Sequence, residues 1–374
     1  MKKILFLTGT RADFGKIKSL ITILDSHQEF EVFLFVTGMH LQKEYGYTLI
    51  EIERCQFNNV HTFENYTHET TMDLTLAKTI EGFSLYCKEV QPDLIVVHGD
   101  RLETLAGAIV GSLNNILVAH IEGGELSGTV DELIRHSVSK LSHIHFVSND
   151  EAAKRLMQMG EMQSSIFTIG SPDIDIMFSN DLPSLEQAKE YYQIPFSNYA
   201  VVMFHPVTTE FNQMKRYADD FVNALLEDHH NYVVIYPNND LGSQHIIDTY
   251  QKLKTNPRFR VFPSLRFEYF LTLLKNSQYI IGNSSAGIRE APYYGIPVIN
   301  IGTRQQNRAV HADIVNVDYS KKSIANALLL IDTLNVHSST SDFGLGNSAA
   351  LFLSSLTSEI IWTINHQKQF SISQ

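Results

Sequence analysis

The sequence predicts an α/β protein made of two Rossmann-like domains, whose parallel sheets face a cleft. Short apolar runs alternate with longer segments of helical periodicity along most of the 374 residues. The runs are almost continuously apolar, which is typical of parallel strands covered by helices on both faces. The alternation stops over residues 170–199, where prolines gather, and then restarts. Because the chain also exceeds the usual size of a single core, two domains are expected.

The first half contains six predicted strands. Residues 4–7 end in a turn rich in Gly, Thr and Arg, and a helix with apolar periodicity follows over residues 17–24. Residues 58–71 are polar and irregular and carry no predicted element, whereas residues 74–90 have helical spacing. The expected strands of this half are 4–7, 32–36, 94–97, 116–119, 144–147 and 166–169.

The second half repeats the pattern after one short helical stretch within residues 170–199. A final helix is expected over residues 348–364, where apolar residues recur at helical spacing. The expected strands of this half are 201–204, 233–236, 261–262, 279–281 and 298–301, each followed by polar or glycine residues. Polar strand ends in both halves place the expected site in the cleft between the two domains.

Composition excludes several classes of protein. The formal charge of −12 argues against a nucleic-acid or anionic-membrane binder, so an anionic ligand must be held by local groups. Cys55 and Cys87 are the only cysteines and form no disulfide framework or close metal-ligand pair, so we expect a reduced, cytoplasmic protein. The apolar run near the start is too short for a signal peptide, and none approaches the roughly 18 residues of a membrane span.

Three acids follow predicted strands or the glycine-rich loop between them. Asp100 and Glu122 come just after the strands 94–97 and 116–119, and Asp131 lies nine residues beyond Glu122. An acid at such a position is commonly a helix cap or a partner for Arg101 or Arg135. Three acids at one sheet edge nevertheless favour proton transfer, because clustered carboxylates raise one another's pKa and provide an acid and a base near neutrality.

The segment Gly282–Glu290 predicts a phosphate site. It follows a strand and opens an expected helix, so backbone N–H groups and two serine hydroxyls could bind a phosphate without net positive charge. Glu290, about one turn later, could accept hydrogen bonds from ribose hydroxyls. An ordinary serine N-cap is an equally good explanation of this motif alone. The serine nucleophile elbow does not fit, because no Gly-x-Ser-x-Gly is present.

Other motifs are weaker. The turn at residues 9–15 is neither Gly-x-Gly-x-x-Gly nor a Walker loop, which argues against NAD and ATP, although Arg11 could meet a diphosphate. His205 could donate to a phosphate oxygen, or it could be an ordinary loop histidine. His143 and His145 alternate on one strand face, but no third ligand at suitable spacing supports a metal site.

Several long motifs together resemble the hydrolysing UDP-N-acetylglucosamine 2-epimerases of bacterial sialic-acid synthesis. The likeness begins at GTRADFGK and ends at Arg308. The non-hydrolysing relatives lack the GGELSG segment. The motifs are HGDRLETLAGA, HIEGGELSGTVDELIRHSVSKLSHIHFV, HPVTTE, YPNND, GNSSAGIREAPYYGIPVIN and IGTRQQNR.

The resemblance implies a GT-B-like fold, with a first domain over residues 1–170, a UDP-binding domain over 171–354, and a C-terminal helix, about 355–374, packed back on the first. It implies a homo-oligomer, dimer or tetramer, and a reaction without metal or cofactor. Asp100, Glu122 and Asp131 would do the chemistry. The UDP-binding residues would be Arg11, Arg101, His205, Asn238, Phe262, Ser284, Ser285, Gly287, Glu290 and Arg304.

The implied reaction converts UDP-N-acetylglucosamine and water into N-acetylmannosamine and UDP through 2-acetamidoglucal. Glu122 is the expected base for the elimination, and Asp131 and Asp100 are expected to serve the hydration. The nearest alternative is the same reaction on UDP-N,N′-diacetylbacillosamine, for legionaminic acid. More distant alternatives are a GT-B glycosyltransferase and a non-catalytic UDP-sugar sensor.

Overall fold

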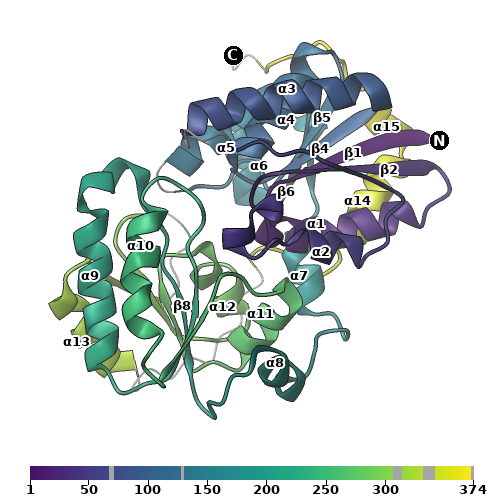
Figure 1. The fold of residues 1–374 in the computed structure, drawn as a ribbon. Coiled ribbons are helices and arrows are strands. Elements are labelled where there is room, and N and C mark those ends of the chain that lie inside the picture. Colours follow the sequence, from purple (N-terminus) through teal and green to yellow (C-terminus); the bar gives the residue numbers. More distant parts are fainter. Residues whose placement is uncertain (67–70, 128–129, 306–313, 332–341, 372–374) are drawn as a thin grey trace. The chain divides into compact units, whose positions relative to one another are not determined.

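The computed structural model describes residues 1–66, 71–127, 130–305, 314–331 and 342–371 (Figure 1). Gly128 and Arg308 of the motifs above, and the end of the expected 355–374 helix, lie outside this part of the chain. The chain divides into two compact units: unit 1 comprises residues 1–125, 131–179 and 342–374, and unit 2 comprises 126–130 and 180–341. The boundaries expected from the sequence are residues 170 and 354.

Unit 1 contains a seven-stranded parallel sheet in the order β3-β2-β1-β4-β5-β6-β7. The strand order reverses between β1 and β4, and this switch point is where open α/β sheets place their ligands. The strands are β1 (Lys2–Thr8), β2 (Phe30–Val36), β3 (Asn59–Thr62), β4 (Leu94–His98), β5 (Leu117–Ile121), β6 (Ile144–Val147) and β7 (Ile166–Thr168).

Both faces of this sheet are buried, which explains why its strands are continuously apolar. Ile4 and Phe6 of β1 belong to the core cluster that includes α1 and the C-terminal helices. Leu7 lies on the opposite face, close to α3 and α4. The helices of unit 1 are α1 (Arg11–Asp25), α2 (Leu49–Glu53), α3 (Met72–Val90), α4 (Leu102–Leu113), α5 (Val130–Leu141), α6 (Asp150–Gln158), α7 (Pro172–Met177), α14 (Ser348–Thr357) and α15 (Glu359–Trp362).

The C-terminal segment belongs to unit 1. In Figure 1 the yellow α14 lies beside the purple α1, although more than 300 residues separate them in the chain. Phe352 of α14 packs on the rings of Phe6 and Phe146. The helix expected over residues 348–364 is interrupted at Ser358, whose backbone is extended and whose hydroxyl accepts from the N–H of Ile360. That serine therefore starts α15 as a separate short helix. The helix expected over about 355–374 is also wrong, because α15 ends at Trp362 and residues 363–371 are not helical.

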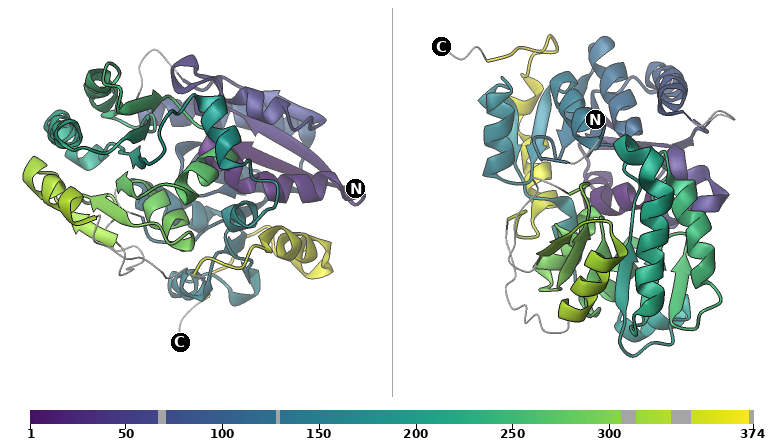
Figure 2. Two further views of the ribbon diagram at one scale, coloured as in Figure 1. Left: turned by 90° about the horizontal axis from the view of Figure 1, so that it is seen from below. Right: turned by 90° about the vertical axis from the view of Figure 1, so that its left-hand side faces the viewer.

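Unit 2 contains a six-stranded parallel sheet in the order β10-β9-β8-β11-β12-β13, with its switch point between β8 and β11. Helix α9 packs against both α10 and α13 on one face (Figure 2). The strands are β8 (Ala200–Met203), β9 (Tyr232–Ile235), β10 (Phe259–Phe262), β11 (Ile280–Gly282), β12 (Val298–Ile301) and β13 (Ile314–Val317). The α-helices are α8 (Leu185–Tyr192), α9 (Phe211–Glu227), α10 (Ser243–Tyr250), α11 (Phe267–Lys275), α12 (Glu290–Tyr293) and α13 (Lys321–Ile331).

The two parallel-sheet α/β units confirm the predicted fold class. Two edge strands, β3 and β13, are absent from the sequence prediction, and their side chains are mostly only partly buried. Among the described residues, no helix is both long and apolar enough to cross a membrane.

Candidate functional site

The carboxyl edge of the sheet in unit 1 brings two of the three predicted acids together through one arginine. The Arg135 guanidinium, 4% exposed, donates to a carboxylate oxygen of Asp100 and to the backbone carbonyl of Glu122, the latter at 2.7 Å. Asp131 lies four residues before Arg135 in the first turn of α5, so the two side chains start from the same helix face. The arginine pairing of Asp100 is the ordinary alternative named above, and here it also holds the loop that carries Glu122.

Glu122 is buried and has a backbone conformation that non-glycine residues rarely adopt. Its φ is +63°, a left-handed value that costs roughly 1–2 kcal/mol for such a residue. The hydrogen bond from Arg135 and a 2.8 Å bond from the Glu122 N–H to the carbonyl of Phe146 hold this geometry. Strain of this kind gathers at functional sites, where the surrounding structure enforces it.

The Glu122 carboxylate contacts two side chains. Its Oε1 accepts a hydrogen bond from the Ser171 hydroxyl, and its Oε2 lies 3.2 Å from Nε2 of His98, off the direction of a good hydrogen bond. On the other side of the ring, Nδ1 of His98 lies 2.7 Å from Oδ1 of Asp13. Burial lowers the pKa of His98, but Glu122 and Asp13 outweigh it and raise the pKa to about 9.

This electrostatic arrangement differs from the expectation that the clustered carboxylates raise one another's pKa. Asp100 faces a guanidinium and Glu122 faces a protonated imidazole, so each acid is next to a cation. A nearby cation stabilises the carboxylate form of an acid. His98, Asp13 and Ser171 have no assigned role in the sequence prediction, because the residues they contact come from other strands and helices.

A buried histidine supports the loop after β4. His120 Nε2 lies 2.8 Å from the carbonyl of Gly99, and its Nδ1 lies 3.0 Å from the hydroxyl of Ser139. Burial lowers the pKa of His120 well below its usual value, so the ring is neutral. A neutral ring must carry its proton on Nε2 to donate to the carbonyl, and Nδ1 then accepts from Ser139.

Arg11 and Arg101, the two predicted UDP-binding cations of unit 1, start helices at the same edge. Arg11 is the first residue of α1 and lies 3.6 Å from Glu51, whereas Arg101 is the N-cap residue of α4 and lies 3.8 Å from Glu103. Both are partly buried beside a carboxylate. Their binding role stays a prediction.

The switch point of unit 2 is built on amides rather than charges. Asn283, fully buried after β11, accepts from the His205 N–H at 2.6 Å and donates to the His205 carbonyl at 2.9 Å. Nδ1 of His205 accepts from the backbone N–H of Asn238 at 3.0 Å. The neutral His205 ring therefore carries its proton on Nε2. Asn283 has no role in the sequence prediction, although it lies inside the GNSS motif.

The predicted residues after Asn283 gather near it. Ser284 caps the 3₁₀ turn Ser285–Gly287 by accepting from the N–H of Ala286, which is the serine-cap alternative, and Glu290 is 2% exposed. The expected continuous helix is wrong: the 3₁₀ turn and α12 are separate, and α12 has only four residues before Gly295, whose left-handed φ of +65° ends it. The helix-dipole argument for phosphate binding therefore fails, while the hydroxyls and turn N–H groups remain.

The remaining predicted residues of unit 2 lie at the same edge of the sheet. Arg304 donates to the carbonyl of Asn283 at 3.4 Å, and Gln305 donates to the same oxygen at 2.9 Å. Phe262 ends β10, with its ring 5.3 Å from that of Tyr192. Phe262 thus lies two strands away from His205 in the sheet order.

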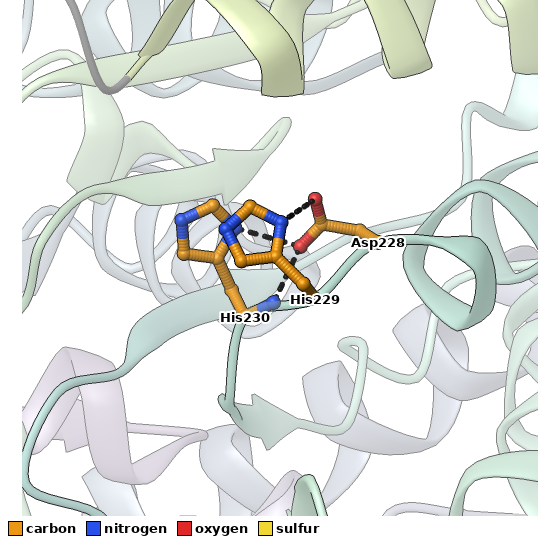
Figure 3. A group of neighbouring side chains, drawn as sticks. All are labelled: Asp228, His229 and His230. Carbon is orange, nitrogen blue, oxygen red and sulfur yellow. Dashed lines mark hydrogen bonds and ion pairs between the residues drawn. The ribbon is translucent and has the colours of Figure 1, made fainter.

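One group among the described residues has metal-ligating atoms close together: Asp228, His229 and His230 (Figure 3). Asp228 Oδ2 accepts from the Tyr232 hydroxyl at 2.6 Å and from the His230 N–H at 2.8 Å, and His230 Nδ1 lies 2.7 Å away. The group joins α9 to the start of β9, at the opposite sheet edge from His205. These bonds explain it as a stabilised turn. His143 and His145, the other pair considered, bond to separate partners.

Comparisons with known proteins identify the family of the chain. Residues 22–357 match the family model described as UDP-N-acetylglucosamine 2-epimerase. The chain is 48% identical to "UDP-N-acetylglucosamine 2-epimerase" of Neisseria meningitidis serogroup B over 99% of both chains. It is 33% identical to "UDP-N,N′-diacetylbacillosamine 2-epimerase (hydrolyzing)" of Legionella pneumophila over 88% of both.

The solved structure of Methanocaldococcus jannaschii UDP-GlcNAc 2-epimerase in complex with UDP-GlcNAc and UDP superposes with a TM-score of 0.82. It covers 96% of this chain and 99% of that chain at 21% identity, a level that shows the fold alone. That fold is the GT-B-like pair of parallel-sheet domains expected from the sequence. The family model and the two relatives establish that the chain belongs to the UDP-N-acetylglucosamine 2-epimerase family.

Proposed function

We propose that the protein is a hydrolysing UDP-N-acetylglucosamine 2-epimerase, which converts UDP-N-acetylglucosamine and water into N-acetylmannosamine and UDP. The observation that carries the proposal is the buried Glu122 carboxylate, held in a strained backbone conformation beside a cation. The neighbouring cation stabilises the charged form of the carboxylate, and in that form Glu122 can accept a proton from carbon. The 48% identity to the Neisseria enzyme supports the sugar nucleotide.

Relatives named as hydrolysing support this type of reaction. The Legionella relative is 33% identical, and "GDP/UDP-N,N′-diacetylbacillosamine 2-epimerase (hydrolyzing)" of Campylobacter jejuni is 29% identical. The names of the relatives from Neisseria meningitidis, Bacillus subtilis and Salmonella typhimurium, which are 48%, 25% and 22% identical, do not mention hydrolysis. The GGELSG segment after Glu122, which the non-hydrolysing enzymes lack, points the same way.

Unit 2 carries the residues proposed to bind the diphosphate and the ribose. Ser284, Ser285 and the turn N–H of Gly287 would bind the diphosphate, and His205 would donate to it from Nε2. Glu290 would accept hydrogen bonds from the ribose hydroxyls. Because these donors are neutral, the chain needs no basic surface to hold an anion. Arg11, Arg101, Asn238, Phe262 and Arg304 complete the proposed UDP-binding set.

The proposed chemistry has two steps. The C1–O bond breaks and its electron pair leaves with UDP, while Glu122 takes the C2 proton and a C1=C2 double bond forms. Water then adds its hydroxyl to C1, and a proton returns to C2 on the opposite face, so that C2 is inverted. Asp131 and Asp100 would serve this hydration. The two acids are assigned to this step together, without separate roles.

The test is incubation with UDP-N-acetylglucosamine in deuterated water, without metal or acceptor, followed by NMR. We expect UDP and N-acetylmannosamine with deuterium at C2. UDP-N-acetylmannosamine as the product would assign the non-hydrolysing reaction, and N-acetylglucosamine would assign simple hydrolysis. Turnover of UDP-N,N′-diacetylbacillosamine alone would assign the second candidate, which the Legionella relative supports. A UDP-sugar sensor would bind without turnover.

A cytoplasmic role in sialic-acid synthesis belongs to the same proposal. "Polysialic acid biosynthesis protein P7" of Escherichia coli is 34% identical over 88% of this chain, which supports that role. We expect a homo-oligomer, dimer or tetramer, from the family resemblance. Size-exclusion chromatography with light scattering would report its mass, and a monomer would contradict the expectation.

A further inference from the structure

A line of buried ionisable side chains runs away from Glu122 across the switch point of unit 1. Asp13 of α1, His98 at the end of β4 and Glu122 after β5 lie on three different elements. The two carboxylates flank the imidazole ring, at 2.7 Å from Nδ1 and 3.2 Å from Nε2. Each of the three side chains is less than one-tenth exposed. Water therefore does little to screen the charges from one another.

Hydrogen bonds fix the Asp13 carboxylate, and the donor and acceptor of each one can be assigned. The Thr8 hydroxyl donates to Asp13 Oδ2 at 2.7 Å, and the backbone N–H of Gly9 donates to the same oxygen. Thr8 in turn accepts from Nε2 of His40 at 3.2 Å, and His40 accepts at Nδ1 from Thr48 at 2.8 Å. Burial lowers the pKa of His40 to about 4, so this second ring is neutral. Asp13 is thus held as an acceptor, and Nδ1 of His98 must donate to it.

The charge of His98 follows from its surroundings. Burial lowers its pKa, but the carboxylates of Glu122 and Asp13 raise it to about 9, so the ring is an imidazolium at neutral pH. His120 is neutral and leaves this balance unchanged at that pH. The ionisable groups that interact with the ring or with its two carboxylates include Asp13 from α1, His40, Glu122 and His120 from β5 and its end, and Arg135 from α5.

We propose that His98 and Asp13 are positioning residues for the epimerase reaction: Asp13 fixes the His98 ring, and His98 orients the Glu122 carboxylate and keeps it ready to accept the C2 proton. The inference rests on the proposed function, in which Glu122 is the base. A positioning role requires both geometry and charge. The Ser171 hydroxyl holds one Glu122 oxygen by a hydrogen bond, and the imidazolium attracts the other as an ion pair at 3.2 Å, which together set the direction of the carboxylate.

A purely structural ion pair predicts different behaviour. If the pair only stabilised the fold, activity would follow stability, and its pH dependence would not change when His98 is replaced. If His98 and Asp13 position Glu122, loss of the His98 proton lowers kcat while KM stays the same. The pH dependence of kcat therefore separates the two explanations.

The experiment compares His98→Asn and His98→Gln, which are both neutral. Asn places an amide nitrogen near the position of Nδ1 and keeps the donor to Asp13, whereas Gln reaches the position of Nε2 and keeps a donor to Glu122. We expect kcat to fall about 100-fold in His98→Asn and about 10-fold in His98→Gln, with KM and the UDP Kd changed by less than about threefold. Wild-type kcat should fall as the pH rises through about 9, and both variants should lack this limb.

Asp13→Asn provides a second, independent arm. Removing one of the two carboxylates lowers the pKa of His98, so the basic limb of kcat should move to lower pH instead of disappearing. Ile21→Val is the matched control for lost stability, because Ile21 is fully buried in the core cluster of unit 1 and its change removes one methylene. This control should keep the wild-type pH profile.

The inference is overturned if the His98 variants keep the wild-type basic limb, or if their kcat falls only as far as their melting temperatures predict from the Ile21→Val control. Failure of the proposed function looks different. In that case the wild-type enzyme itself would produce no N-acetylmannosamine with deuterium at C2, before any variant is made.

Discussion

The switch points of the two sheets have the same strand order but opposite chemistry. In unit 1, Asp13, His98 and Glu122 form a line of buried charges, and Arg135 pairs with Asp100 beside it. In unit 2 the equivalent position holds His205 and Asn283, joined by neutral hydrogen bonds between an amide and the backbone. Charged groups at a buried edge favour proton transfer, whereas neutral donors favour holding an anion. We therefore expect turnover to depend mainly on unit 1 and UDP affinity mainly on unit 2, to which Arg11 and Arg101 of unit 1 would add.

The largest effect is expected for Glu122→Gln, which tests the role of unit 1 in turnover. Gln has the same shape and can still accept from Ser171, but it cannot take a proton, so kcat should fall about 1000-fold while the UDP Kd changes by less than about threefold. UDP release measures kcat, and calorimetry measures the Kd. Glu132→Gln on the exposed side of α5 is the matched control and should leave kcat unchanged. Equal losses of UDP affinity and kcat would contradict the proposed division of roles between the two units.

The second test is the pH dependence of stability in unit 1. The folded pKa of His98 is raised from 6.5 to about 9, so its contribution is complete below pH 6.5 and is lost as the pH rises through 9. The free energy of unfolding should decrease by up to about 3 kcal/mol between these limits, because each tenfold change in proton affinity corresponds to about 1.4 kcal/mol. Urea unfolding at pH 6 and pH 10 measures the change. A His98→Gln variant with the same pH slope as wild type would remove His98 as its source.

The third test addresses unit 2 through Asn283→Ala. This change leaves the N–H and carbonyl of His205 without their side-chain partner, which should weaken UDP binding about 30-fold, or about 2 kcal/mol. Asn283→Asp keeps the acceptor for the N–H and loses the donor to the carbonyl. The UDP Kd should rise in both variants, while kcat at saturating substrate falls less than about threefold. A large loss of kcat with unchanged Kd would contradict the binding role of this edge.

The smallest expected effect is that of Glu290→Ala. Losing an acceptor for the ribose hydroxyls should weaken UDP binding about 10-fold, or about 1.4 kcal/mol, with little change in kcat. Calorimetry with UDP measures the effect, and Glu227→Ala, an exposed acid of the same unit paired with Lys321, is the control. An unchanged UDP Kd in Glu290→Ala would remove Glu290 from the binding set.

Much of the candidate site can be predicted because its residues directly follow apolar strands. Asp100, Glu122 and His205 come just after strand ends, and the sheet order brings such ends to one edge. The partners of these residues are harder to find. Asp13 and Ser171 lie 85 and 49 residues from the side chains they bind, and nothing in local spacing links such positions.

The strand cores can be predicted from the amino-acid pattern, because strands buried on both faces are continuous apolar runs. The strand predicted over residues 144–147 matches β6 to the residue. The apolar pattern did not reveal β3 and β13, because polar residues interrupt both four-residue strands and their side chains are only partly buried. The protonation states of the site, in contrast, depend on contacts made in the folded protein. A pKa depends on burial and on neighbours from other elements, so His98 is an imidazolium and His120 is neutral, although both are histidines at the ends of adjacent strands.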